Sequence, residues 1–119
     1  MDLRPKTIIC DIDGTLVEHG SPSQVATSTY KMTLLPGTLT KLEEWEAKGY
    51  RIILLTGRKE SMREVTKAQL KEVGIFYDQL IMGVGGGARY LINDNKPNGA
   101  EYATAINVER NKGVKDINI

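Results

Sequence analysis

The chain has 119 residues, a length that suits one compact domain and is too short for two independent hydrophobic cores. Its composition, 40% hydrophobic and 26% charged, is typical of a soluble globular protein and argues against a chain that is disordered throughout. Sixteen basic and fifteen acidic residues give a net charge of +1, so the overall positive charge that drives nonspecific nucleic-acid binding is lacking. We therefore expect one domain over residues 1–119.

The sequence also bears on the cellular compartment. Cys10 is the only cysteine and has no partner for an intramolecular disulfide, and the first residues lack the apolar core and cleavage pattern of a signal peptide. No apolar run approaches the roughly 20 residues that a membrane-spanning helix needs. We expect a cytoplasmic protein without a membrane partner, in which Cys10 is inert packing.

The first half of the chain predicts a strand, a flap and a helix. Residues 7–12 form a short apolar run rich in β-branched side chains, which indicates a central strand buried on both faces. Residues 16–33 show weak periodicity with Gly, Pro, Ser and Thr, and favour a loop or a small two-stranded flap. Residues 36–49 predict a helix, because apolar side chains recur there at three-residue spacing.

The second half repeats the alternation of strands and helices. Residues 51–56 predict another buried strand, and the following helix places its apolar residues on one face before it ends at Gly74. Short strands are expected at residues 79–82, 89–93 and 103–108. This order predicts an α/β fold with an open, mostly parallel sheet that carries helices on both faces.

Polar residues follow three of the predicted strands. Side chains two apart in a strand point to the same side, so Asp11 and Asp13 should project together from the end of the first strand. Thr56-Gly57-Arg58 and Asn93-Asp94 follow later strands, and ligand sites of open α/β sheets lie beyond the carboxyl ends of the strands. The alternatives are an ordinary Asp-Gly turn at the first position and a structural salt bridge for Arg58.

The chain resembles the haloacid dehalogenase superfamily of phosphatases. Their first motif is an apolar strand that ends in DxDGT, and residues 11–16 read Asp-Ile-Asp-Gly-Thr-Leu. Their second motif, an apolar strand ending in Thr or Ser, is similar to residues 52–56, and the fourth, a strand ending in an acid, is similar to residues 90–94. In order and spacing the resemblance covers nearly the whole chain.

This resemblance implies a role for each matching residue. Asp11 would attack phosphorus and form an aspartyl-phosphate, and Asp13 would protonate the leaving oxygen and then activate water. Thr56 would hydrogen-bond a phosphoryl oxygen. Candidate substrate-binding residues are Gly57, Arg58 and Asn93.

A magnesium ion is the implied cofactor. Two carboxylates that face a phosphate dianion would repel it, and a hard cation with oxygen ligands offsets that repulsion. The implied ligands are Asp11, the backbone carbonyl of Asp13, and Asp94. An ordinary Asn-Asp turn is the alternative for Asp94.

The sequence departs from the family pattern at the third motif, a lysine that neutralises the nucleophile and the phosphate. Residues 83–88 contain no lysine. Lys96 is the first choice for the missing cation because it follows Asp94 closely, and Arg89 and Lys67 are the alternatives. His19, a single histidine in the flap, is typical of a solvated loop residue.

The short flap limits the choice of substrate. Residues 16–33 are too few for the cap domain that many relatives insert after the first motif, so an uncapped site would accept large substrates or take its lid from a second copy of the chain. The leading expectation is a sugar phosphate or a related small phosphomonoester. Alternatives are a non-catalytic phosphate-binding module and a polynucleotide or protein phosphatase, and the near-neutral charge argues against a nucleic-acid partner. A receiver-like domain does not fit, because its phosphorylated aspartate would follow a later strand.

Overall fold

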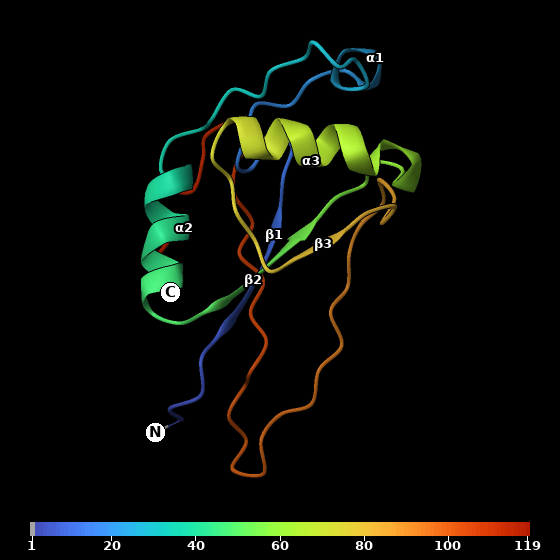
Figure 1. Cartoon of the computed structure of the whole chain (residues 1–119). Helices are drawn as coiled ribbons and strands as arrows, with labels where there is room; N and C mark the ends of the chain where they lie inside the picture. The colour runs from blue at the N-terminus through green and yellow to red at the C-terminus, as the bar shows by residue number, and fades with distance from the viewer. Residues whose placement is uncertain (1) are drawn as a thin grey trace.

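A computed structural model of the chain describes residues 2–119 and contains a three-stranded parallel sheet (Figure 1). Its strands are β1 (Thr7–Asp11), β2 (Arg51–Leu55) and β3 (Gln79–Ile81), in the spatial order β1-β2-β3. The α/β fold class is therefore confirmed. The prediction that β1 is the central strand is wrong, because β2 lies between the other two.

One face of the sheet forms the hydrophobic core. In register, Ile8 lies beside Ile52, and Cys10 lies beside Leu54, which in turn pairs with Leu80. All five side chains are buried and belong to one cluster. Side chains of the opposite face alternate with them, and Ile9 there is 52% exposed, so β1 is buried on one face only and not on both.

Helices α2 (Thr38–Ala47) and α3 (Arg63–Glu72) cover that buried face. Leu42 and Trp45 of α2 and Leu70 of α3 are fully buried in the same cluster as the strand residues, as the apolar spacing predicts. Both helices share a face because right-handed crossovers through strands in sequential order stay on one side of the sheet. The prediction of helices on both faces is wrong. In residues 2–119 no helix is long and apolar enough to cross a membrane.

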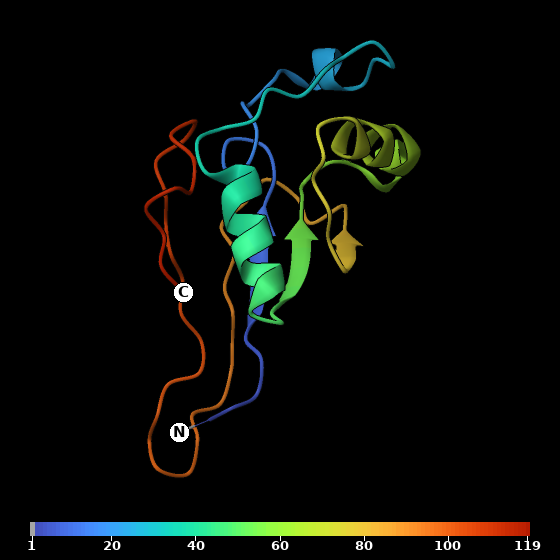
Figure 2. The same ribbon diagram turned by 60° about the vertical axis from the view of Figure 1, so that its left-hand side comes forward.

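A flap follows the first motif, as expected. Its base is closed by a bridge between Val17 and Leu34 and by the Glu18 N–H, which donates to the Thr33 carbonyl at 2.9 Å. Its tip carries the short helix α1 (Pro22–Val25), which Ser21 caps. Figures 1 and 2 place the flap at the carboxyl end of the strands, on the same side as α3.

Residues 88–109 form no helix or strand, so the strands predicted at 89–93 and 103–108 are absent. The segment runs down past the amino end of the sheet and returns, and it gives the molecule a longest dimension of 50 Å against 28 and 25 Å (Figures 1 and 2). A parallel strand needs a crossover of about a dozen residues to return to the amino end of the sheet. Only residues 82–88 separate β3 from the first expected strand, and this connection is too short. We call residues 88–109 the extended segment.

The last ten residues fold back onto the loop after β1. Asn111 N–H donates to the Gly14 carbonyl at 2.8 Å, and Val114, which is fully buried, donates to the Pro36 carbonyl at 2.9 Å. Gly113 has a φ of +87°, and a side chain there would collide with Pro36. This close packing positions the C-terminal turn against the first motif.

Candidate active site

The loop after β1 places two carboxylates at the carboxyl rim of the sheet. Asp11 ends β1 and its side chain is 36% exposed, and Asp13 follows with a side chain that is 19% exposed. Gly14 takes a φ of +87°, which a residue without a Cβ adopts at little cost and which allows the chain to turn sharply. Thr15 adds a long hydrogen bond of 3.4 Å to the Asp11 carboxylate. Asp11 is thus open to a substrate and Asp13 is more enclosed.

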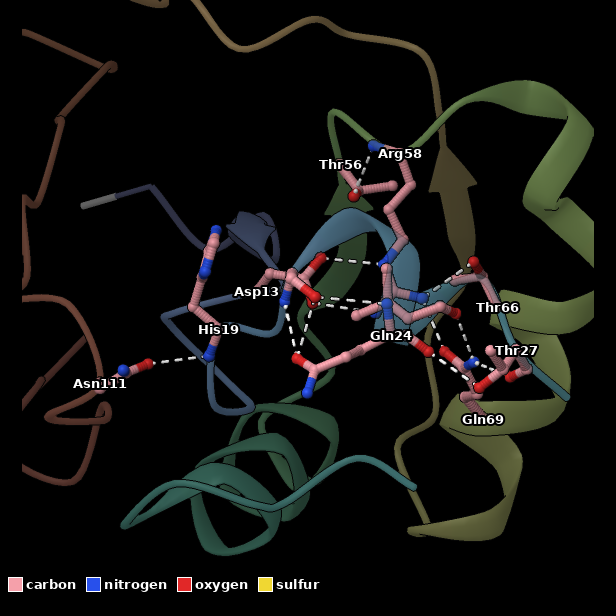
Figure 3. A network of polar contacts seen from close by, with 11 residues as sticks. Asp13, His19, Gln24, Thr27, Thr56, Arg58, Thr66, Gln69 and Asn111 are labelled. Carbon is pink, nitrogen blue, oxygen red and sulfur yellow. Dashed lines mark hydrogen bonds and ion pairs between the residues drawn. The ribbon is translucent and has the colours of Figure 1, made fainter. Parts of the chain in front are cut away.

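Arg58 holds the carboxylate of Asp13. Its Nε and Nη2 atoms donate to the two Asp13 oxygens, each at 2.9 Å, which is the bidentate geometry of a strong guanidinium–carboxylate pair. The Arg58 side chain is only 5% exposed, and its Nη1 donates to Thr66 at 3.1 Å and to Gln69 at 2.6 Å. Figure 3 shows Arg58 between Asp13 and these α3 side chains. In the structure Arg58 forms the salt bridge that was the alternative to substrate binding.

Gln69 extends this network to the flap. Its Oε1 accepts from Arg58, and its Nε2 donates to the carbonyls of Val25 at 2.8 Å and Thr27 at 3.5 Å. The Gln69 and Thr66 side chains are buried. Buried polar groups without partners are costly, so each hydrogen bond of this network helps to keep its neighbours in place.

Thr56 and Gly57 shape the turn after β2. Thr56 is buried, and its hydroxyl oxygen accepts from the Arg58 N–H at 3.1 Å. At Gly57 a Cβ would lie 3.0 Å from the Gly85 carbonyl oxygen, so the glycine lets the loop after β3 pack closely there. The turn thus carries Arg58 to Asp13.

Arg89 supplies the cation beside Asp11. Its Nη1 lies 3.2 Å from the Asp11 carboxylate, at the start of the extended segment. Lys96, the first choice from the sequence, lies at the other end of the sheet. Its Nζ is 4.4 Å from the ring of Tyr102, whose hydroxyl donates to Asp2. Lys67, the third candidate, lies on α3 beside Glu64.

Asp94 and Asn93 lie on the extended segment, both exposed, and Asn93 donates to the Asp94 carbonyl at 3.1 Å. Within residues 2–119, no three His, Cys, Asp or Glu side chains gather closely enough to hold a metal ion. Asp94 therefore does not join Asp11 and Asp13 in this structure, because the strand that should have carried it to the rim does not form.

The structure shows residues around the site that sequence reasoning missed. Thr66 and Gln69 are polar residues on the apolar face of α3, and polar residues at buried helix positions indicate a hydrogen-bond network. Asn111 comes from the far end of the chain, and its Oδ1 accepts from the backbone N–H of His19 at 2.9 Å (Figure 3). Only its φ of 62° marks it as unusual, and no sequence pattern indicated it.

Cys10 points into the core, on the opposite side of β1 from Asp11. Burial raises the pKa of its thiol to about 12, because the thiolate would lose its hydration there, and the nearby charge of Asp11 adds to the effect. The thiol thus stays protonated and takes no part in the site.

Known proteins resemble this chain in sequence and in fold. The family model of the polynucleotide kinase PNKP phosphatase domain, a HAD family, matches residues 5–89. Two solved structures of the Pnkp1/Rnl/Hen1 complex contain similar chains. The chain in the structure described as an RNA repair complex is 36% identical over 66% of this chain, with a TM-score of 0.56. The chain in the second structure is 31% identical over 72% of this chain, with a TM-score of 0.57. This chain spans 25% and 30% of those two chains. No curated protein matches significantly.

A structural-genomics protein from Vibrio cholerae has the same fold, with 20% identity, a TM-score of 0.54 and coverage of 74% of this chain and 79% of the other. The family match includes both strand ends that form the rim, from Asp11 to Arg58, and it extends to Arg89. It covers most of the sequence, so the chain belongs to the polynucleotide kinase PNKP phosphatase-domain family of the HAD superfamily and is a phosphatase domain.

Proposed function

We propose that this domain removes terminal phosphate groups from polynucleotides, with Asp11 as the nucleophile and Asp13 as the acid–base residue. The observation that carries this proposal is the pair of carboxylates at one rim, each facing a different arginine: Arg89 for Asp11 and Arg58 for Asp13. Two acids in different surroundings can take different roles in one reaction. Membership of a polynucleotide kinase phosphatase-domain family supports the choice of substrate.

In the proposed reaction, a carboxylate oxygen of Asp11 attacks phosphorus and the bond to the leaving oxygen breaks. Asp13, which must bind a proton on one oxygen before this step, gives that proton to the leaving oxygen, and an aspartyl-phosphate remains on Asp11. Asp13 then takes a proton from a water molecule that attacks the same phosphorus, which releases phosphate and restores Asp11. The Arg89 guanidinium offsets the repulsion between the Asp11 carboxylate and the incoming phosphate.

We also propose that the domain depends on Mg²⁺. The Asp11 carboxylate and the Asp13 carbonyl fit this ion, which binds through one or two carboxylates together with substrate phosphate and water. When bound, it would neutralise charge on the transferring phosphoryl group. Asp94 is the proposed third ligand, and it requires a movement of the extended segment, since that segment holds Asp94 apart from the other two.

The open rim suits a polymer end. The flap is small and Asp11 is partly exposed, so a phosphate at the end of a long chain can reach it. The related chains in the RNA repair complex also favour a polynucleotide over the sugar phosphate that the short flap suggested. The proposed partner is therefore a nucleic-acid end, contrary to the inference from net charge.

Hydrolysis assays test this function. Wild type and Asp11→Asn would be compared on p-nitrophenyl phosphate, on RNA and DNA oligonucleotides with a 3′- or 5′-terminal phosphate, and on a set of sugar phosphates, each with Mg²⁺ or with EDTA. We expect Mg²⁺-dependent release of phosphate by the wild type, with the highest kcat/KM on an oligonucleotide, and loss of turnover in Asp11→Asn. Equal rates for the two proteins would refute the mechanism. A clear preference for sugar phosphates would refute the polymer substrate alone.

A further inference from the structure

We propose that Gln69 is a positioning residue that makes the orientation of the Asp13 carboxylate depend on the seating of the flap. The inference rests on the proposed role of Asp13. It is carried by a continuous run of hydrogen bonds from the flap, through α3 and the turn after β2, to the loop after β1 (Figure 3).

The first step is the contact between Gln69 and the flap. The Nε2 atom donates to the Val25 carbonyl at 2.8 Å and, more weakly, to the Thr27 carbonyl at 3.5 Å. The other polar link between the flap and α3, among the described residues, is the exposed ion pair of Lys31 with Glu72. Exposed pairs contribute little, so the buried amide is the main polar contact between the flap and α3.

The second step is the contact between Gln69 and Arg58. The same amide group contacts Arg58 and the flap. Its oxygen accepts from Arg58 Nη1 at 2.6 Å, and its nitrogen donates to the flap. A movement of the flap that draws the amide with it therefore pulls on the guanidinium. The amide group is planar and the side chain is buried, so it cannot turn freely to keep one partner when the other moves.

The third step is the contact between Arg58 and Asp13. A guanidinium is a rigid plane, and Nε and Nη2 engage both oxygens of Asp13 at 2.9 Å. A tilt of the plane at Nη1 thus shifts both bonds to the carboxylate. A seated flap aligns Asp13 for proton transfer, and a displaced flap misaligns it.

Two substitutions separate this relay from a simple support for Arg58. Gln69→Glu keeps an acceptor for Arg58, now a charged one, but has no N–H for the Val25 carbonyl, so it breaks the link to the flap and retains the link to Arg58. Thr66→Val is the matched control, because it removes the other acceptor of Nη1 and leaves the flap contact intact. Gln69→Met removes both links at similar volume.

We expect kcat to fall on the order of 10-fold or more in Gln69→Glu and Gln69→Met, with KM close to that of the wild type, because a small misplacement of a catalytic group is costly. Thr66→Val should lose less of kcat than either Gln69 variant, because the contact of Gln69 with the flap and its contact with Arg58 both remain. If Gln69 only supports Arg58, Gln69→Glu will behave like the wild type and Thr66→Val will show the larger loss, and the relay is refuted.

Hydrogen exchange provides a readout that does not depend on turnover, which keeps this inference separate from the proposed function. Amide exchange in residues 22–28 should be faster in Gln69→Glu than in the wild type or Thr66→Val, with thermal melting used to confirm that each variant is folded. Because coupling is reciprocal, Asp13→Ala should also accelerate exchange in the flap. Unchanged exchange in both Gln69→Glu and Asp13→Ala would refute the relay, whatever the activity of the wild type.

Discussion

Each of the two acidic residues at the rim is paired with its own arginine, and the two pairs differ in burial. The pair of Asp13 with Arg58 is enclosed, while the pair of Asp11 with Arg89 is open to solvent, with both side chains more than a third exposed. An enclosed pair holds a carboxylate in one orientation, whereas an open pair can part to admit a phosphate. The burial of each pair thus matches the proposed role of its acid.

Removal of Arg58 tests the enclosed pair. Arg58→Ala would leave Asp13 as an uncompensated, mostly buried charge, and we expect the free energy of unfolding to fall by about 3–5 kcal/mol. Lys67→Ala is the control, since its ion pair with Glu64 is exposed and 3.9 Å long, and it should change stability by less than about 0.5 kcal/mol. Urea denaturation measures both. Similar small losses in the two variants would contradict the assigned role of Arg58.

Arg89 and Lys96 give opposite predictions for catalysis. Arg89 contacts Asp11, and loss of a group that stabilises developing charge typically lowers rates by about 10²–10³, so we expect Arg89→Ala to lower kcat/KM by that factor. Lys96 lies beside Tyr102, away from the rim, so Lys96→Ala should leave kcat/KM unchanged. Both side chains are partly or fully exposed, and neither variant should unfold. A larger loss in Lys96→Ala would restore the choice made from the sequence.

Among the parts of the fold, the extended segment is a long stretch in which no residue is buried. It contains no helix or strand, and its apolar residues Tyr90, Leu91 and Ile92 are all exposed. Segments with little buried apolar area open at low free-energy cost. The segment can therefore move toward the rim, where β1 has an unpaired edge among the described residues.

The freedom of the extended segment to move toward the rim leads to a prediction for Asp94. Two carboxylates at the rim attract a divalent cation, and ligands can be gathered as metal binds. We expect Asp94→Asn to need an Mg²⁺ concentration about 10-fold higher or more for half-maximal rate. Glu101→Gln, an exposed change on the same segment, should leave the Mg²⁺ dependence as it is. An Mg²⁺ titration of Asp94→Asn that matches the wild type would show that Asp94 stays away from the ion.

At the scale of the whole molecule, the core lies on one side of the sheet only. Cys10 belongs to that core, and burial raises the pKa of its thiol to about 12. The ordinary pKa of a cysteine is about 8.5, so the folded state keeps the proton where the unfolded state loses it. This contribution to stability is complete below about pH 8.5 and is lost as the pH rises towards the pKa of the folded state.

Thiol chemistry tests the burial of Cys10. At pH 8 the folded protein should fail to react with Ellman's reagent, and the unfolded protein should release one equivalent of chromophore, since the chain has one cysteine. The rate of reaction in rising urea should follow the fraction unfolded, measured by circular dichroism. Rapid reaction of the folded protein would show that this side of the sheet opens locally.

Local pattern was enough to predict β1, β2, α2, α3 and the flap, along with the placement of Asp11, Asp13 and Thr56 at the rim. Hydrophobic periodicity and turn residues act over a few positions, and those positions are contiguous in the chain. The same pattern placed strands at 89–93 and 103–108, where local preference for a strand was not sufficient. The number of residues between β3 and the next strand prevented the crossover, and chain length between elements is a global property.

The partners of each charge were decided by the tertiary structure. Arg58 follows β2 at a position that looked ready for a substrate, yet folding brings Asp13, Thr66 and Gln69 from three other segments onto its donors. Arg89 lies against Asp11 and Lys96 does not, because the path of the extended segment after Arg89 leads away from the rim. Hydrogen bonds and ion pairs act only at contact distance, and which distant residues reach that distance depends on the complete fold.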